Sequence, residues 1–285
     1  MRVMLGTDGS PDAVLATDWL AHFPLPREST IRIVSVVPAL PSGVQPLREQ
    51  HESLSAYARQ VAEEAQAKLG PRSVDVRVLE GHVRVQLLEA AQAWEADVIV
   101  LGARGLSGLE RALLGSVSLG VAREARCAVM IVKGTAKSVQ RIVVGLDGSE
   151  DAGTALTFLT QLPLPAETDV VLVGVAEKIY FPRSAPGLVA ERLRASVAQI
   201  EEEDKLRKQQ VLLEAERLLK GKTRVQVKSL VGNPADEIVS TAATTRAQLV
   251  VLGNRGLGGV QRVLLGSVSE RVLLQAECTV LIVKQ

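Results

Sequence analysis

The chain of 285 residues is long enough for two domains of ordinary size, and its 33 Lys and Arg against 32 Asp and Glu give a formal net charge of +1. This balance excludes the strongly basic surface that is typical of proteins binding nucleic acids or anionic membranes. Hydrophobic residues make up 47% of the chain and aromatic residues only 2%. Aliphatic side chains must therefore build the core, as they do in buried parallel strands.

Three features of the sequence bear on its location in the cell. The N-terminal residues lack the apolar segment of a secretory signal, and no apolar run reaches the length of a membrane span. The two cysteines, Cys127 and Cys278, lie far apart and are interpreted as small buried side chains rather than as a disulfide or metal site. We therefore expect a cytoplasmic protein that contacts neither a membrane nor nucleic acid.

The first half alternates short apolar segments with segments of helical periodicity. The helical pattern is clearest where Leu54, Tyr57, Val61 and Ala65 recur at three or four residues. The apolar segments predict strands near Val3–Gly6, Ile31–Val37, Val74–Leu79, Asp97–Leu101 and Ala128–Val132. Such alternation predicts an α/β fold with a doubly wound parallel sheet.

The second half repeats the first. Over Leu101–Lys133 and Leu252–Lys284, 20 of 33 aligned residues are identical. The offset between the copies is 139 at the first strand and 151 at this segment, so the second copy is 12 residues longer in between. We expect domains at residues 1–133 and 141–285, joined by a linker at 134–140. A helical stretch from about Leu188 to Lys220 holds an acidic run, Glu201–Asp204, which is interpreted as a solvated helix face.

Three segments of each half fall where strands are predicted to end, which is where open parallel sheets bind ligands. They are the stretch Thr7–Ser10, the glycines Gly102 and Gly105, and the pair Gly115–Ser116. Glycines let a phosphate approach the backbone, and a helix N-terminus attracts it. Each segment also has a purely structural interpretation. Asp8 could be a turn or N-cap residue, Ser116 a helix N-cap, and the glycines residues of tight turns. The pattern is neither a P-loop nor a dinucleotide-binding motif.

With these motifs present twice, each half resembles a universal stress protein domain of the ATP-binding type, over residues 2–133 and 141–284. The resemblance implies a five-stranded parallel sheet with helices on both faces. It also implies that the aspartate after the first strand contacts adenosine, that a valine of the second strand flanks the base, and that the glycines and serine hold ribose and phosphates. The implied residues are Asp8, Val36, Leu101, Gly102, Arg104, Gly105, Gly115, Ser116 and Val117 in the first half, and Asp147, Val175, Leu252, Gly253, Arg255, Gly256, Gly266, Ser267 and Val268 in the second.

The resemblance and the residues together predict an ATP-binding stress-response protein with two sites. Mg²⁺ is expected to bind through the phosphates, without side-chain ligands. No catalytic residue is expected, because phosphoryl transfer needs a base or water-orienting group, and Glu110 near the first glycine loop becomes Gln261 in the second. Two alternatives stay open, namely a slow ATPase or phosphotransferase and a nucleotide-free interaction module.

The last strand of each half is apolar and carries charge only just beyond its end. The strand order of the resembled family would place this strand at an edge of its sheet, and an exposed apolar edge invites pairing with another strand. Members of that family dimerise through these strands. We expect Ala128–Val132 and Thr279–Val283 to pair within the chain, and a homodimer of the whole chain is left open.

Overall fold

A computed structural model describes residues 1–39, 48–70, 72–106, 114–135, 138–177, 187–256 and 265–284. In the first half the elements are β1 (Arg2–Gly6), α1 (Pro11–His22), β2 (Thr30–Val37), α2 (Arg48–Lys68), β3 (Ser73–Glu80), α3 (Val83–Ala93), β4 (Val98–Gly102), α4 (Ser116–Glu124) and β5 (Ala128–Val132). In the second half they are β6 (Arg141–Gly145), α5 (Glu150–Gln161), β7 (Asp169–Ala176), α6 (Gly187–Leu219), β8 (Arg224–Val231), α7 (Pro234–Thr245), β9 (Leu249–Gly253), α8 (Ser267–Gln275) and β10 (Thr279–Val283).

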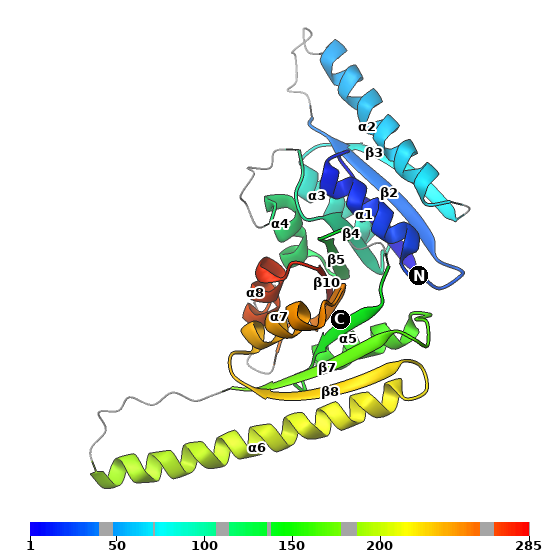
Figure 1. Cartoon of the computed structure of the whole chain (residues 1–285). Helices are drawn as coiled ribbons and strands as arrows, with labels where there is room; N and C mark the ends of the chain where they lie inside the picture. The colour runs from blue at the N-terminus through cyan, green and yellow to red at the C-terminus, as the bar shows by residue number, and fades with distance from the viewer. Residues whose placement is uncertain are drawn as a thin grey trace.

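All ten strands form one sheet, in the order β3-β2-β1-β4-β5-β10-β9-β6-β7-β8. Within each half the five strands are parallel, which confirms the predicted α/β class. The two halves meet where β5 and β10 pair antiparallel, with Met130 opposite Leu281 (Figure 1). The final strands therefore pair within the chain, as the sequence predicts.

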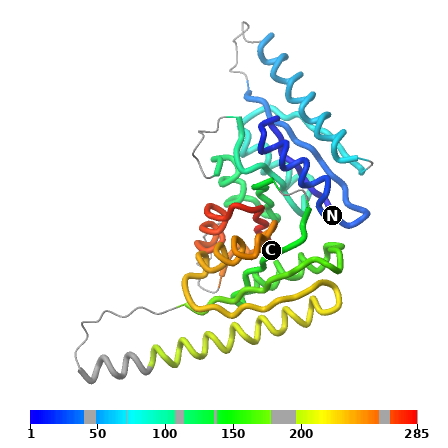
Figure 2. Tube along the Cα trace, in the orientation of Figure 1, coloured from blue at the N-terminus to red at the C-terminus, as the bar shows by residue number. Residues whose placement is uncertain are grey.

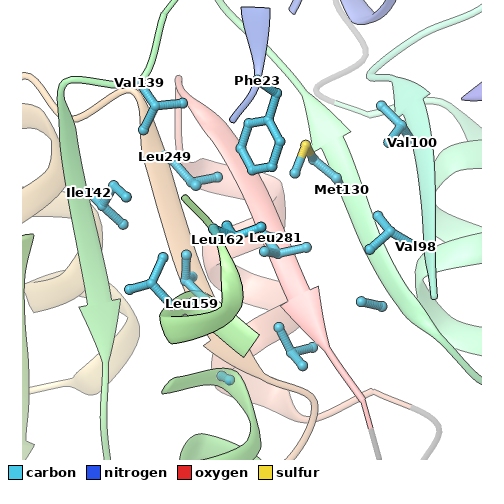
Figure 3. Packing of buried hydrophobic residues seen from close by; sticks show 14 of the residues in the cluster. Phe23, Val98, Val100, Met130, Val139, Ile142, Leu159, Leu162, Leu249 and Leu281 are labelled. Carbon is cyan, nitrogen blue, oxygen red and sulfur yellow. The ribbon is translucent and has the colours of Figure 1, made fainter. Parts of the chain in front are cut away.

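The core is continuous across this junction. Alternate residues of β5 point to opposite faces of the sheet, so that Met130 lies in one buried cluster and Val129 and Ile131 lie in the other. Figure 3 shows residues of the first cluster from both halves, among them Phe23, Met130, Leu159 and Leu281. Helices α1, α2, α5 and α6 cover this face, and α3, α4, α7 and α8 cover the other.

Two lysines form hydrogen bonds across the junction, each to carbonyls of the other half. Lys133, just after β5, donates hydrogen bonds to the carbonyls of Leu273 and Ala276 at the end of α8. Lys284, just after β10, donates to the carbonyls of Arg123 and Ala125 at the end of α4, at 3.2 and 2.8 Å. Each half thus supplies a hydrogen-bond donor to the last carbonyls of a helix in the other half.

The second half differs mainly in its long helix. Helix α6 has 33 residues and α2 has 21, and the difference of 12 equals the insertion seen in the sequence. It packs against β7 and β8 at the edge of the sheet, as Figure 2 shows by the path of the chain. No helix in the described part of the chain is long and apolar enough to cross a membrane.

Candidate functional site

A cleft of about 860 Å³ opens at the carboxyl ends of β6, β7 and β9 in the second half. Its walls are these strand ends, the first turn of α8 and one face of α6. All nine residues that the resemblance implies for this half line it, namely Asp147, Val175, Leu252, Gly253, Arg255, Gly256, Gly266, Ser267 and Val268. The fold therefore brings segments more than 100 residues apart in sequence to one place.

The aspartate after the first strand ties two loops together. The Asp8 carboxylate accepts the backbone N–H of Ser10 and of Leu106, each at 3.0 Å. A Cβ on Gly105 would lie 2.6 Å from the same carboxylate, and a Cβ on Gly256 would lie 2.6 Å from the carboxylate of Asp147. These glycines are needed because the carboxylate occupies the space of a side chain.

Gly102 has a packing role besides the expected one. A Cβ on Gly102 would lie 2.5 Å from the backbone of Asp12. Because glycine has no Cβ, the first turn of α1 can pack on the end of β4. A Cβ on Gly253 would likewise lie 2.5 Å from the backbone of Asp151 in α5. A side chain at either glycine would displace a helix, whatever ligand the cleft holds.

Helix α4 begins without a side-chain cap. Its N-cap is Gly115, and Ser116 is the first helical residue, so the interpretation of Ser116 as an N-cap was wrong. Gly266 and Ser267 repeat this arrangement at α8. The reason is geometric, because the N–H of each glycine donates to the preceding loop at 2.8 Å and leaves the serine inside the first turn. The N-cap glycines have no side chain to cap the first N–H groups of these helices, so within the described residues no N-cap side chain accepts from them.

A second serine, missed by the sequence analysis, fixes each of these helices. Ser118 donates a 2.7 Å hydrogen bond from its buried hydroxyl to the carbonyl of Gly102, and Ser269 does the same to Gly253. The helix N-terminus is thereby held at the strand end. The motif Gly-Ser-Val-Ser stands in both halves and could have revealed this role.

Arg104 forms an ion pair with α1 in the first half. Its guanidinium donates to the carboxylate of Asp12 at 2.8 and 3.3 Å, and this hydrogen bond raises the pKa of Arg104. In the second half the backbone N–H of Arg255 donates to Asp151 at 2.9 Å, and the Arg255 side chain lines the cleft.

The other expected positions belong partly to the core. Ser10 caps α1, as the structural interpretation of the first loop holds, and its hydroxyl also donates to the carbonyl of Arg104 at 3.2 Å. The side chain of Leu101 packs over Gly6. Val36 and Val117 lie half-buried, at the end of β2 and in the first turn of α4. Glu110 and Gln261 lie outside the described residues.

The acidic run of α6 is not simply a solvated face. Glu201, Glu203 and Asp204 line the cleft, which corrects the sequence interpretation. The periodicity of the helix turns these positions toward the strand ends. Lys208 on the same face is 6% exposed and donates to the main-chain carbonyl of Asp147 at 2.9 Å. Among the described residues, no group of three or more His, Cys, Asp or Glu is placed to hold a metal ion.

Comparison with known proteins places these two similar halves in a family. The family model for the universal stress protein family matches residues 1–133 and again residues 138–284. The chain belongs to the universal stress protein family. Universal stress protein Rv1996 of Mycobacterium tuberculosis is 29% identical over 314 residues, covering 100% of this chain and 95% of its own. Rv2005c of the same organism is 30% identical over 312 residues, covering 99% and 97%.

The tandem arrangement is also found in a solved structure. A universal stress protein from Archaeoglobus fulgidus superimposes with a TM-score of 0.66 and 22% identity, covering 99% of this chain and 98% of the other. This likeness shows the fold. These two relatives and the solved structure are each matched over at least 95% of their own length, so the similarity spans both halves.

Proposed function

We propose that this universal stress protein binds ATP, one molecule in each half, and acts as a regulatory binding protein in a stress response. The observation that carries the proposal is the cleft at the carboxyl ends of β6, β7 and β9. There the Asp147 tip, the loop from Gly253 to Gly256 and the uncapped start of α8 line one cleft. The choice of ATP among nucleotides follows from the family's glycine pattern.

The start of α8 suits the phosphates. Its first N–H groups have no side-chain cap, and the helix dipole adds a partial positive charge. Ser267 is exposed in that first turn and offers a hydroxyl. We expect Mg²⁺ to accompany the ligand through its phosphates, as is usual for this ion.

The opposite side of the cleft suits a nucleoside. A carboxylate such as Asp147 accepts hydrogen bonds, so it favours ribose hydroxyls or an amino group over phosphate. Val175, which is 5% exposed, provides an apolar surface for the base. The cleft volume of about 860 Å³ falls within the roughly 300–1,000 Å³ range of small-molecule sites.

We favour binding over fast turnover because the features that the two halves share are those of a binding site. Both keep the aspartate, the glycine loop and the uncapped helix start. The carboxylates that α6 places at its cleft are not repeated on α2, whose sequence differs there. Phosphoryl transfer would require a positioned base or water-orienting group.

Native mass spectrometry of the purified chain, before and after incubation with Mg²⁺ and ATP, tests this proposal. We expect mass increments of one and two nucleotides, and ATP in the acid extract. A chain that stays free of nucleotide at millimolar ATP would contradict the proposal and favour a nucleotide-free interaction module.

A further inference from the structure

The cleft of the second half contains a buried lysine that the shared motifs do not include. Lys208 is more than nine-tenths buried, although lysine is rarely buried without a partner. Its ammonium donates to the Asp147 carbonyl at 2.9 Å and lies 3.9 Å from the carboxylate of Asp204. That carboxylate is closer to Arg207, with which it forms a hydrogen-bonded ion pair. An ammonium has three donors, and the Lys208 side chain lines the cleft, where a ligand could accept from it.

The first half has no lysine at the corresponding position. A Cβ on Gly9 would lie 2.8 Å from Val61, and one on Gly148 would lie 3.0 Å from Val211. These equivalent contacts align α2 with α6 at an offset of 211 − 61 = 150, so Lys208 corresponds to residue 58. That residue is Ala58, which is 5% exposed. The two halves therefore share the glycine loop but differ in the helix that faces it.

We propose that Lys208 contacts the bound nucleotide directly and makes the C-terminal cleft the tighter of the two sites. This inference rests on the proposed function. The ammonium lies at the tip of β6, beside the aspartate assigned to the nucleoside end, and it offers donors where that aspartate offers an acceptor. Together they recognise a ligand that carries both donors and acceptors, as a nucleoside does. Ala58 offers neither.

The test measures each site alone in the full-length chain. Ser116 and Ser267 are exposed at the first helical position, where Glu favours the helix and opposes a phosphate. Ser116→Glu therefore isolates the C-terminal site, and Ser267→Glu isolates the N-terminal one. Titration calorimetry with Mg²⁺ and ATP should give a dissociation constant about 10-fold to 100-fold lower for the C-terminal site, the effect expected of one charged hydrogen bond.

Adding Lys208→Met to each isolated-site chain locates the effect. We expect about a 10-fold to 100-fold loss at the C-terminal site and no change at the N-terminal site. Lys205→Met is the matched control, because Lys205 lies on the same helix outside the cleft and pairs with Glu202. It should leave both constants unchanged.

Lys208→Gln separates ligand contact from support of the β6 tip. Glutamine keeps a neutral donor for the Asp147 carbonyl but removes the charge. Affinity as low as in Lys208→Met supports contact with the ligand, whereas full recovery assigns a positioning role and overturns the proposal. Equal constants at the two sites would also overturn it. Absence of ATP binding in the parent chain would refute the proposed function as well, so the two failures are distinguishable.

Discussion

The pair of lysines at the junction predicts an unusual dependence of stability on pH. Burial lowers the pKa of Lys133 and of Lys284 to about 8, from an ordinary value of 10.5. Below pH 8 both lysines are charged in the folded and the unfolded chain, and their burial lowers the free energy of unfolding by its full amount. This destabilisation disappears as the pH rises toward 10.5, because the folded chain releases the protons first. Burial raises the pKa of Cys127 and Cys278 to about 11, from 9.0. The buried neutral thiols stabilise the folded chain below pH 9, and this stabilisation is lost as the pH rises toward 11.

The two effects oppose each other, but the lysines act first. At pH 8.5 the unfolded chain holds roughly 1.5 more lysine protons and the folded chain roughly 0.5 more cysteine protons, a net difference of about one. The free energy of unfolding should then rise with pH between pH 8 and 9, by on the order of 1 kcal/mol per pH unit. Solvent screening makes this an upper value, because both lysines are partly exposed.

Urea unfolding at closely spaced pH values measures this slope. The double variant Lys133→Met with Lys284→Met keeps only the cysteine contribution, so its free energy of unfolding should fall slightly over the same interval. The two slopes should differ by about 2 kcal/mol per pH unit, and all other titrating groups cancel in the comparison. Parallel slopes for the parent chain and the variant would refute the burial of charge at this junction.

Two further predictions concern the packing and the chemistry of the site. Gly102→Ala should destabilise the chain by about 1–3 kcal/mol, because its Cβ would meet the backbone of α1. Gly153→Ala in α5, where nothing lies within 4 Å, should instead stabilise it by about 0.5–1 kcal/mol, and thermal unfolding compares them. A loss at both positions would contradict the packing argument. Replacing Asp8 and Asp147 together by Asn should weaken ATP binding by about 1.5–3 kcal/mol in calorimetry. Inorganic triphosphate should bind as before, and equal weakening of the two ligands would show that the carboxylates do not select the nucleoside.

The strands and the convergence of the glycine loops could be predicted from the sequence, because they follow from local patterns that occur twice. The pairing of the halves also needed the strand order of the resembled family. Predicted strands differ from the observed ones by about one residue at their ends, as for Asp97–Leu101 and β4. The repeat could also have predicted a contact that the sequence analysis missed. Asp12 and Arg104 are both kept in the second half, as Asp151 and Arg255, and this retention could have indicated their pairing.

Lys208 could not be found in this way, because its role depends on a difference between the copies. The offset changes from 139 at Asp147 to 150 within α6. The register between α2 and α6 comes from the packing of Val61 near Gly9 and of Val211 near Gly148, which requires the structure. The acidic run before it has the composition of a solvated helix, so a local pattern favoured the wrong interpretation.

The central claim, that each half binds one ATP, is tested most directly by calorimetric stoichiometry in the presence of Mg²⁺. The parent chain should bind two molecules, the Ser116→Glu and Ser267→Glu variants one each, and the double variant none. These substitutions place a carboxylate at the exposed start of α4 or α8 without touching the core. A stoichiometry of two that survives both substitutions would show that ATP binds elsewhere, and a stoichiometry of one for the parent chain would contradict a site in each half.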